Sequence, residues 1–303
     1  ATRDLDSSLV GSEMCIRDSA GIVSSLDDIE YWSGSGVNRA GLVVDWDGKS
    51  SSDESLAWGF RWDGTATAED LLRAVLSADQ RLYSKFTSLA GYSSIIVNGM
   101  GYDDNDDCLF ALSDGTTFNA SGIHSGAPSD LATSVDPNDL YAEGWFFYAT
   151  IGSWHIGTSA ANPFDGGAWS SASAGISDLN LASNSWISLA FTTNLADFAE
   201  NPIAAELPGP TGDFDLNDDV DGADFLTWQR GFGILSDASR TQGDADCNGM
   251  VDTNDRHLWE ENFGLAASTT TSSFSAMTVP EPHGAFLLLG MSLLLISRRY
   301  QRL

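Results

Sequence analysis

Cysteine and basic residues are scarce in this chain of 303 residues. The three cysteines, Cys15, Cys108 and Cys247, lack the CxxC spacing of a zinc site. Their number is small and odd, which does not suit a disulfide framework. Only 14 Lys and Arg stand against 43 Asp and Glu, which gives a formal net charge of -29. A chain this acidic repels nucleic acids and anionic lipids, so we expect neither as a main partner. The acidic surplus suits either a solvated extracellular surface or cation binding, and the spacing of the acids must decide between them.

An apolar run long enough for an ordinary membrane span, about 20 residues, is also lacking. The longest run, residues 285–296, follows Pro280, Glu281 and Pro282 and is followed by a basic end at residues 298–302. Because the run is apolar on all sides, it does not suit an amphipathic core helix. This order of parts resembles the PEP-CTERM sorting signal. The resemblance implies a C-terminal hydrophobic helix over residues 279–303, export from a Gram-negative-type bacterium, membrane contact before processing, and recognition and removal of the tail by an exosortase.

Residues 7–19, SSLVGSEMCIRDS, show no periodic pattern and resemble a translated sequencing adapter. We therefore leave residues 1–19, with Cys15, out of the fold prediction. The rest divides by composition into four parts before the tail. They are a main domain at 20–200, a Pro-rich linker at 201–211, an internal repeat at 212–264 and a Ser/Thr-rich spacer at 265–278.

The main domain is predicted to be α+β, a Trp-rich antiparallel sheet with one main helix on its face. Apolar residues recur at helical spacing from Ala68 to Phe86, after a capping box that begins at Thr67. The expected strands cover residues 40–46, 55–62, 94–97, 144–154 and 185–193.

The repeat places oxygen-bearing side chains at matching positions of two twelve-residue loops, 31 residues apart. Positions 1, 3, 5, 9 and 12 carry Asp213, Asp215, Asn217, Asp221 and Asp224 in the first loop, and Asp244, Asp246, Asn248, Asp252 and Asp255 in the second. Position 7, Asp219 or Met250, offers its backbone carbonyl, so its side chain is free to vary. Calcium takes six to eight oxygen ligands from a loop of this kind, and we predict two bound calcium ions. Acidic surface turns, the alternative, have no reason to repeat position by position.

This repeat resembles the type I dockerin module, which is similar to EF-hands, depends on calcium and docks onto cohesin domains. The resemblance implies a small α-helical pair of loop–helix units and a cohesin-like partner. Two departures stand out: Asp218 replaces the turn glycine at position 6, and positions 10 and 11 lack the paired hydroxyl residues that often contact cohesin. The resemblance therefore supports metal binding more strongly than it supports a cohesin-like partner.

A short helix is expected after each loop, ending at Gly233 or Gly264. Four aromatic residues recur on one face of these helices, and we expect them to form the shared core of the repeat. They are Trp228, Phe232, Trp259 and Phe263. Val220 and Val251, at position 8, are expected to pack inward.

The role of the main domain stays open between three hypotheses. In order of preference, they are a non-catalytic surface or matrix protein, a receptor for a glycan or another small ligand, and an extracellular glycan-active enzyme. The segments GYSSIIVNGMGY and GWFFYATIGSW are similar to the ligand-covering domain of cobalamin carriers, which allows a corrinoid-like ligand. An enzyme would need two carboxyl groups within about 10 Å in a cleft. Residues 103–107, DDNDD, are expected to form a solvated loop, and His124 and His155 to be structural.

Overall fold

The protein is described from a computed structural model, which covers residues 21–46, 55–88, 91–126, 132–144, 152–194, 197–200 and 202–265. Within these residues the chain is mostly β, with eleven strands in two mixed sheets and three short α-helices. The predicted α+β class with one antiparallel sheet is wrong. Four strand pairs are parallel, and the three α-helices are too short to form a helical layer.

The first sheet has seven strands in the order β1-β3-β2-β10-β8-β9, with β11 also paired to β3. Its strands are β1 (Trp32–Gly34), β2 (Asn38–Asp45), β3 (Ser55–Trp62), β8 (Ser153–Ser159), β9 (Ser170–Ser171), β10 (Ser185–Thr192) and β11 (Ile203–Ala204). β2, β3 and β10 are buried along most of their length, which explains their nearly continuous apolar sequences. These three strands lie where the sequence predicted them, within two residues at either end.

The second sheet has four strands in the order β6-β4-β5-β7. They are β4 (Leu82–Ser88), β5 (Ile95–Tyr102), β6 (Ile123–Ser125) and β7 (Leu140–Glu143). β5 and β7 are antiparallel, with Tyr102 opposite Leu140 at the end of the ladder. The chain leaving β5 and the chain entering β7 therefore run side by side, which matters for the acidic residues found there.

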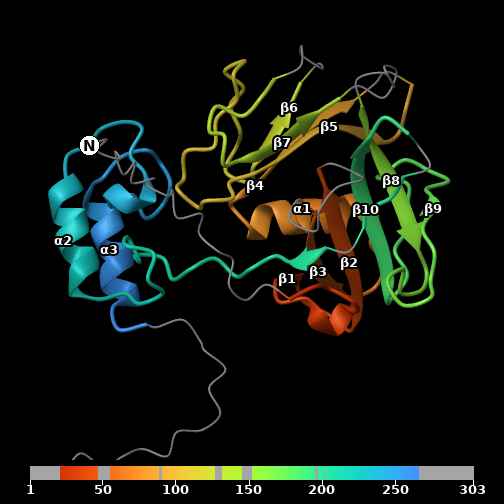
Figure 1. Ribbon diagram of the computed structural model, residues 1–303, viewed down its shortest axis with the longest axis horizontal. Coiled ribbons are helices and arrows are strands. Elements are labelled where there is room, and N and C mark those ends of the chain that lie inside the picture. Colours follow the sequence, from red (N-terminus) through yellow and green to blue (C-terminus); the bar gives the residue numbers. More distant parts are fainter. Residues whose placement is uncertain are drawn as a thin grey trace, which may run out of the picture. The chain divides into compact units, whose positions relative to one another are not determined.

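Helix α1 (Ala68–Ala78) contacts β1 and β3 of the first sheet and β4 of the second (Figure 1). Its capping box joins Thr67 and Asp70 as predicted. The predicted extension to Phe86 is wrong, because the buried Asp79 ends the helix: its carboxylate accepts from the Trp58 indole at 3.0 Å and from the Arg81 side chain at 2.9 Å. The chain then turns into β4.

Two further predicted segments differ from the structure. The strand expected over residues 144–154 appears only at its end, where β8 begins, and residues 145–151 lie outside the described part. The segment expected as a linker contributes β11, which pairs with β3 in parallel, and Ala205 beyond it is buried.

The repeat folds into two loop–helix units with an internal two-fold correspondence. They contain α2 (Gly222–Gly231) and α3 (Thr253–Asn262), joined through a 3-10 turn at Arg240–Gln242. The Trp228 indole donates to the Asp252 carbonyl at 2.8 Å, and the Trp259 indole donates to the Asp221 carbonyl at 2.9 Å. Each helix thus binds the backbone of the other unit's loop, so the two loops are held as one body.

The core of this module is smaller than the sequence suggested. Val220 and Val251 are buried as predicted, and Trp228 packs with Phe214. Phe232 and Phe263 are 54% and 58% exposed, so placing them in the core was wrong. Each lies at the C-terminal end of its helix, before a glycine of positive φ, where the chain turns away from the core.

The C-terminal hydrophobic helix, the Pro280-Glu281-Pro282 motif and the Ser/Thr-rich spacer beyond Leu265 lie outside the described residues, as does Cys15. In the described part of the chain, no helix is both long enough and apolar enough to cross a membrane.

Candidate metal-binding sites

Two groups of three aspartates, one in each loop of the repeat, could hold a metal ion. In each group, one carboxylate oxygen from every residue lies within 4.8 Å of the others. The groups are Asp213, Asp215 and Asp224 in the first loop, and Asp244, Asp246 and Asp255 in the second. In both, the first and last aspartates are buried and the middle one is exposed, so each group opens to solvent on one side.

Backbone N–H groups hold the buried carboxylates of the first loop in place. Asp213 Oδ1 accepts from the Asn217 amide at 3.2 Å, and its Oδ2 accepts from the Asp218 amide at 2.7 Å. Asp224 Oδ1 accepts from the Phe214 amide at 2.7 Å. The loop is therefore wrapped around its own acids, and their remaining lone pairs are free for a cation.

The second loop repeats this pattern 31 residues later. Asp244 Oδ1 accepts from the Asn248 amide at 3.2 Å, and its Oδ2 accepts from the Gly249 amide at 2.6 Å. Asp255 Oδ1 accepts from the Ala245 amide at 2.8 Å. The agreement shows that the sequence repeat is also a structural repeat.

Positive φ angles occur at loop positions 4 and 6 in both units. They are +56° at Leu216 and +69° at Asp218 in the first, and +54° at Cys247 and +79° at Gly249 in the second. The first loop thus closes with aspartate in the place of glycine, in a region that Asp tolerates better than most residues.

Each loop is coupled to the helix that follows it. Asp221 and Asp252 are the N-caps of α2 and α3, and Asp224 and Asp255 complete the capping boxes. A cation that draws in the position-12 carboxylate therefore acts on the first turn of the helix as well.

The two predicted asparagine ligands have their side-chain oxygens engaged with the backbone. Asn217 Oδ1 accepts from the Asp219 amide at 2.9 Å, and Asn248 Oδ1 accepts from the Met250 amide at 2.8 Å. These asparagines shape the turns in the present conformation, and would contribute to an ion only through the other lone pair of the same oxygen.

Burial and mutual repulsion make these acids harder to ionise. Burial raises the pKa of Asp213 and of Asp255, and raises that of Asp244 to about 6. The neighbouring carboxylates add to each rise, while backbone hydrogen bonds oppose it. A bound cation would remove the repulsion, so the arrangement favours a positive ion.

A disulfide joins Cys247, at position 4 of the second loop, to Cys108 in the acidic loop after β5. The sequence did not predict this bond, because the two cysteines are 139 positions apart and a set of three cysteines gives no pairing pattern. Arg240 adds a second link, with its guanidinium 3.1 Å from Asp106 Oδ1.

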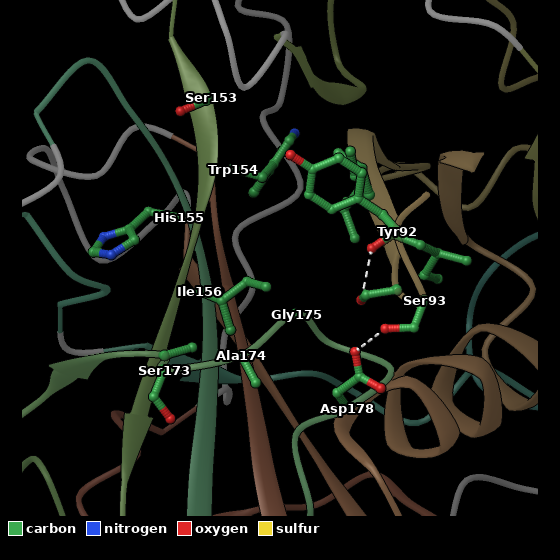
Figure 2. A pocket seen from close by; sticks show the side chains of 15 residues that line it. Tyr92, Ser93, Ser153, Trp154, His155, Ile156, Ser173, Ala174, Gly175 and Asp178 are labelled. Atoms are coloured by element: carbon green, nitrogen blue, oxygen red, sulfur yellow. Dashed lines mark hydrogen bonds between the residues drawn. The ribbon is translucent and has the colours of Figure 1, made fainter. Parts of the chain in front are cut away.

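A separate cavity of about 420 Å³ lies between β5, β8 and the segment 172–178. Figure 2 shows Trp154 and Ile156 of β8 directed into it, while His155 points away, as the alternation of a strand requires. Asp178, on its rim, accepts a hydrogen bond from the Ser93 hydroxyl at 2.6 Å. The His155 ring contacts the Asp197 carbonyl and the Ser171 hydroxyl.

Comparison of the chain with protein-family models, with curated proteins and with solved structures gives no match. Function must therefore be argued from the residues themselves.

Proposed function

We propose that residues 212–264 bind two calcium ions, one in each loop, and form a calcium-stabilised module of an exported, non-catalytic protein of the cell surface or extracellular matrix. The observation that carries this proposal is the repeated group of three aspartates with matching backbone hydrogen bonds.

The ligand chemistry favours calcium over other metals. Both groups consist of carboxylates, the hard oxygen ligands of calcium and magnesium, whereas zinc and copper sites usually include His or Cys. A flexible twelve-residue loop suits the larger ion, since magnesium requires near-ideal octahedral geometry and keeps several waters.

Calcium binding would also add stability that the small core of the module does not provide. Its buried apolar residues are few, namely Phe214, Val220, Trp228, Ala238, Ala245 and Val251. A domain of about 50 residues buries too little surface to be very stable alone, so metal binding becomes part of its folding free energy.

Isothermal titration of the whole chain with calcium tests the proposal. The matched variant carries Asp224→Asn and Asp255→Asn, which keep the side-chain shape and remove one ligand charge from each loop. We expect this variant to take up two fewer ions than the wild type, and the exposed control Asp165→Asn to match the wild type. Equal uptake by the double variant and the wild type would contradict the proposal.

Export is proposed from the tail and supported by the disulfide. Disulfides persist mainly in oxidising compartments outside the cytoplasm. Processing by an exosortase predicts that intact-mass analysis of surface-recovered protein finds a chain truncated near Pro280. A mature chain that still ends at Leu303 would contradict the processing, and one retained in the cytoplasm would contradict export.

The cavity between β5 and β8 favours a second candidate function, the binding of a small ligand. Its volume lies in the range of about 300–1,000 Å³ that is usual for ligand pockets, and Ile95, Trp154 and Ile156 give it apolar walls. A glycan array and a fluorescence titration that follows Trp154 test this function. Replacement of Ile156 by Trp should fill the cavity and abolish any binding found.

A further inference from the structure

The acidic loop after β5 has the same backbone turn as the two metal-binding loops. Asp103 Oδ1 accepts from the Asp107 amide at 3.2 Å, and its Oδ2 accepts from the Cys108 amide at 2.9 Å. These are the residues four and five positions later, as for Asp213 and Asp244 in the repeat. Asp103 is only 2% exposed, so the prediction of a wholly solvated loop does not hold for it.

The same positions also carry the positive φ angles. Asp106, at position 4, has a φ of +50°, and Cys108, at position 6, has a φ of +69°. Asp107 Oδ1, at position 5, accepts the amide two residues later, as Asn217 and Asn248 do. Asp103, Asn105 and Asp107 therefore occupy positions 1, 3 and 5 of a loop of this type.

After position 6 the chain leaves the turn, and the acid that closes the site comes from a different strand. Tyr102 is opposite Leu140 in the last pair of the β5–β7 ladder, so the next residues outward, Asp103 and Asp139, leave the ladder at the same end. The bridge between Leu112 and Ser134 holds the segment before Asp139 against the same loop.

Asp139 brings a buried oxygen without a partner to this place. The residue is 8% exposed, its Oδ2 accepts from the Ser134 hydroxyl at 2.9 Å, and its Oδ1 has no hydrogen-bond partner among the described residues. A buried carboxylate oxygen left unpaired is costly, so this oxygen is a candidate ligand for a cation.

Asn105 has a second unpartnered oxygen. Its Nδ2 lies 3.4 Å from Asp107 Oδ2 and 3.3 Å from Asp136 Oδ2, while its own Oδ1 is buried and unpaired. The amide N–H thus occupies the position between two carboxylates where a cation would lie. A half-turn of the amide would direct Oδ1 there instead.

The charge at this place is unbalanced. In the described part of the chain, no Lys, Arg or His forms an ion pair with Asp103, Asp107, Asp136 or Asp139. The nearby Arg240 guanidinium pairs with Asp106 instead. A divalent cation bound here would offset the repulsion between the carboxylates and give the unpaired oxygens a partner.

We propose that Asp103, Asn105 and Asp107, completed by Asp136 and Asp139, form a third calcium site, located in the β-sheet domain. Among the described residues, only the repeat brings three carboxylates within 4.8 Å of one another. Calcium binding at the third site therefore requires the amide of Asn105 to turn over and the carboxylates to close in. The site is independent of the proposed function of residues 212–264.

Native mass spectrometry of the whole chain in calcium counts the ions. We expect three ions on the wild type, two on a variant with Asp103→Asn and Asp139→Asn, and one on the Asp224→Asn and Asp255→Asn variant. The Asp165→Asn control should carry three. One ion on the wild type that persists in the Asp224→Asn and Asp255→Asn variant but is lost from the Asp103→Asn and Asp139→Asn variant would support the third site and contradict the proposed function.

Two ions on the wild type, unchanged in the Asp103→Asn and Asp139→Asn variant, would overturn the third site. Should that variant fail to fold, amide exchange of the Asp224→Asn and Asp255→Asn variant decides, because Cys108 is bonded to Cys247 and exchange in the wild type would also report calcium bound in the second loop. Calcium should slow exchange of the Asp107 and Cys108 amides at least ten-fold, and an unchanged rate at both would overturn the proposal.

Discussion

The loops of the repeat and the acidic loop of the sheet domain share one backbone turn but complete their acidic groups differently. In the repeat, the closing aspartate lies eleven residues after the first and also lies in the first turn of a helix, as Asp224 does in α2. In the sheet domain, the proposed closing aspartate, Asp139, comes from a distant segment that the pairing of β5 with β7 brings to the end of β5. The same acidic turn can thus be followed by its own helix or lie at the end of a strand pair.

This difference predicts which region needs its ion for folding. The module has a small core and should depend on calcium, whereas the sheet domain has a large core of its own, with Trp58, Leu72 and Leu189 fully buried.

Calcium removal should produce the largest difference in stability between the two regions. With EGTA, the module should lose about 5 kcal/mol of stability, assuming two sites that are each exposed to calcium at about 100 times Kd. Hydrogen exchange should then show α2 and α3 losing protection while β2, β3 and β10 keep theirs. Equal loss in both regions would contradict the contrast.

Reduction of the Cys108–Cys247 disulfide should have the next largest effect. The bond closes a loop of 139 residues between the two regions, and disulfides of this kind contribute about 2–4 kcal/mol. Denaturant unfolding with and without reductant measures the loss. A Cys108→Ser and Cys247→Ser variant is the control, because reductant should leave its unfolding midpoint unchanged.

A smaller effect concerns pH. The pKa of Asp244 is raised by burial to about 6 in the folded module, from an ordinary value of 3.8. The folded state therefore binds the proton more tightly, and this contribution to stability is complete below about pH 4 and is lost as the pH rises through 6. Without calcium, thermal melting of α2 and α3 should accordingly shift to lower temperature between pH 4 and 6.

With calcium the trend should reverse, since the ion binds the ionised carboxylates. If the module instead became more stable between pH 4 and 6 in EGTA, burial would not raise the pKa of these acids.

The smallest expected effect compares the two loops of the repeat. Asp218→Gly should tighten the first site about two- to five-fold, because glycine adopts the positive φ at position 6 with less strain. Gly249→Asp is the reciprocal variant and should weaken the second site by a similar factor. Calorimetry that finds both affinities unchanged would remove turn strain as a cause of unequal sites.

The two groups of three aspartates in the repeat could be predicted from the sequence because their residues are local. All of them fall within twelve consecutive residues, and the second copy confirms the register. The strands β2, β3 and β10 were also predictable, since buried strands have apolar sequences that do not depend on their neighbours.

The rest depends on contacts between distant residues. The end of α1 is set by Asp79 bonding to Trp58 and Arg81, whereas the apolar spacing alone continues to Phe86. Parallel pairing of β2 with β10 and the Cys108–Cys247 bond likewise join segments far apart in the chain. The position of Asp139 at the same end of the ladder as Asp103 belongs to the same class, so a search for ligands spaced along the sequence could not find it.

A crystal structure grown in calcium, with ions located by anomalous scattering, would show directly whether the repeat binds the metal. We predict one calcium in each loop of the repeat, about 2.3–2.6 Å from carboxylate oxygens of Asp213, Asp215 and Asp224 and of their counterparts Asp244, Asp246 and Asp255. Two folded loops that stay free of calcium at millimolar concentration, with their aspartates bonded only to backbone and water, would contradict it.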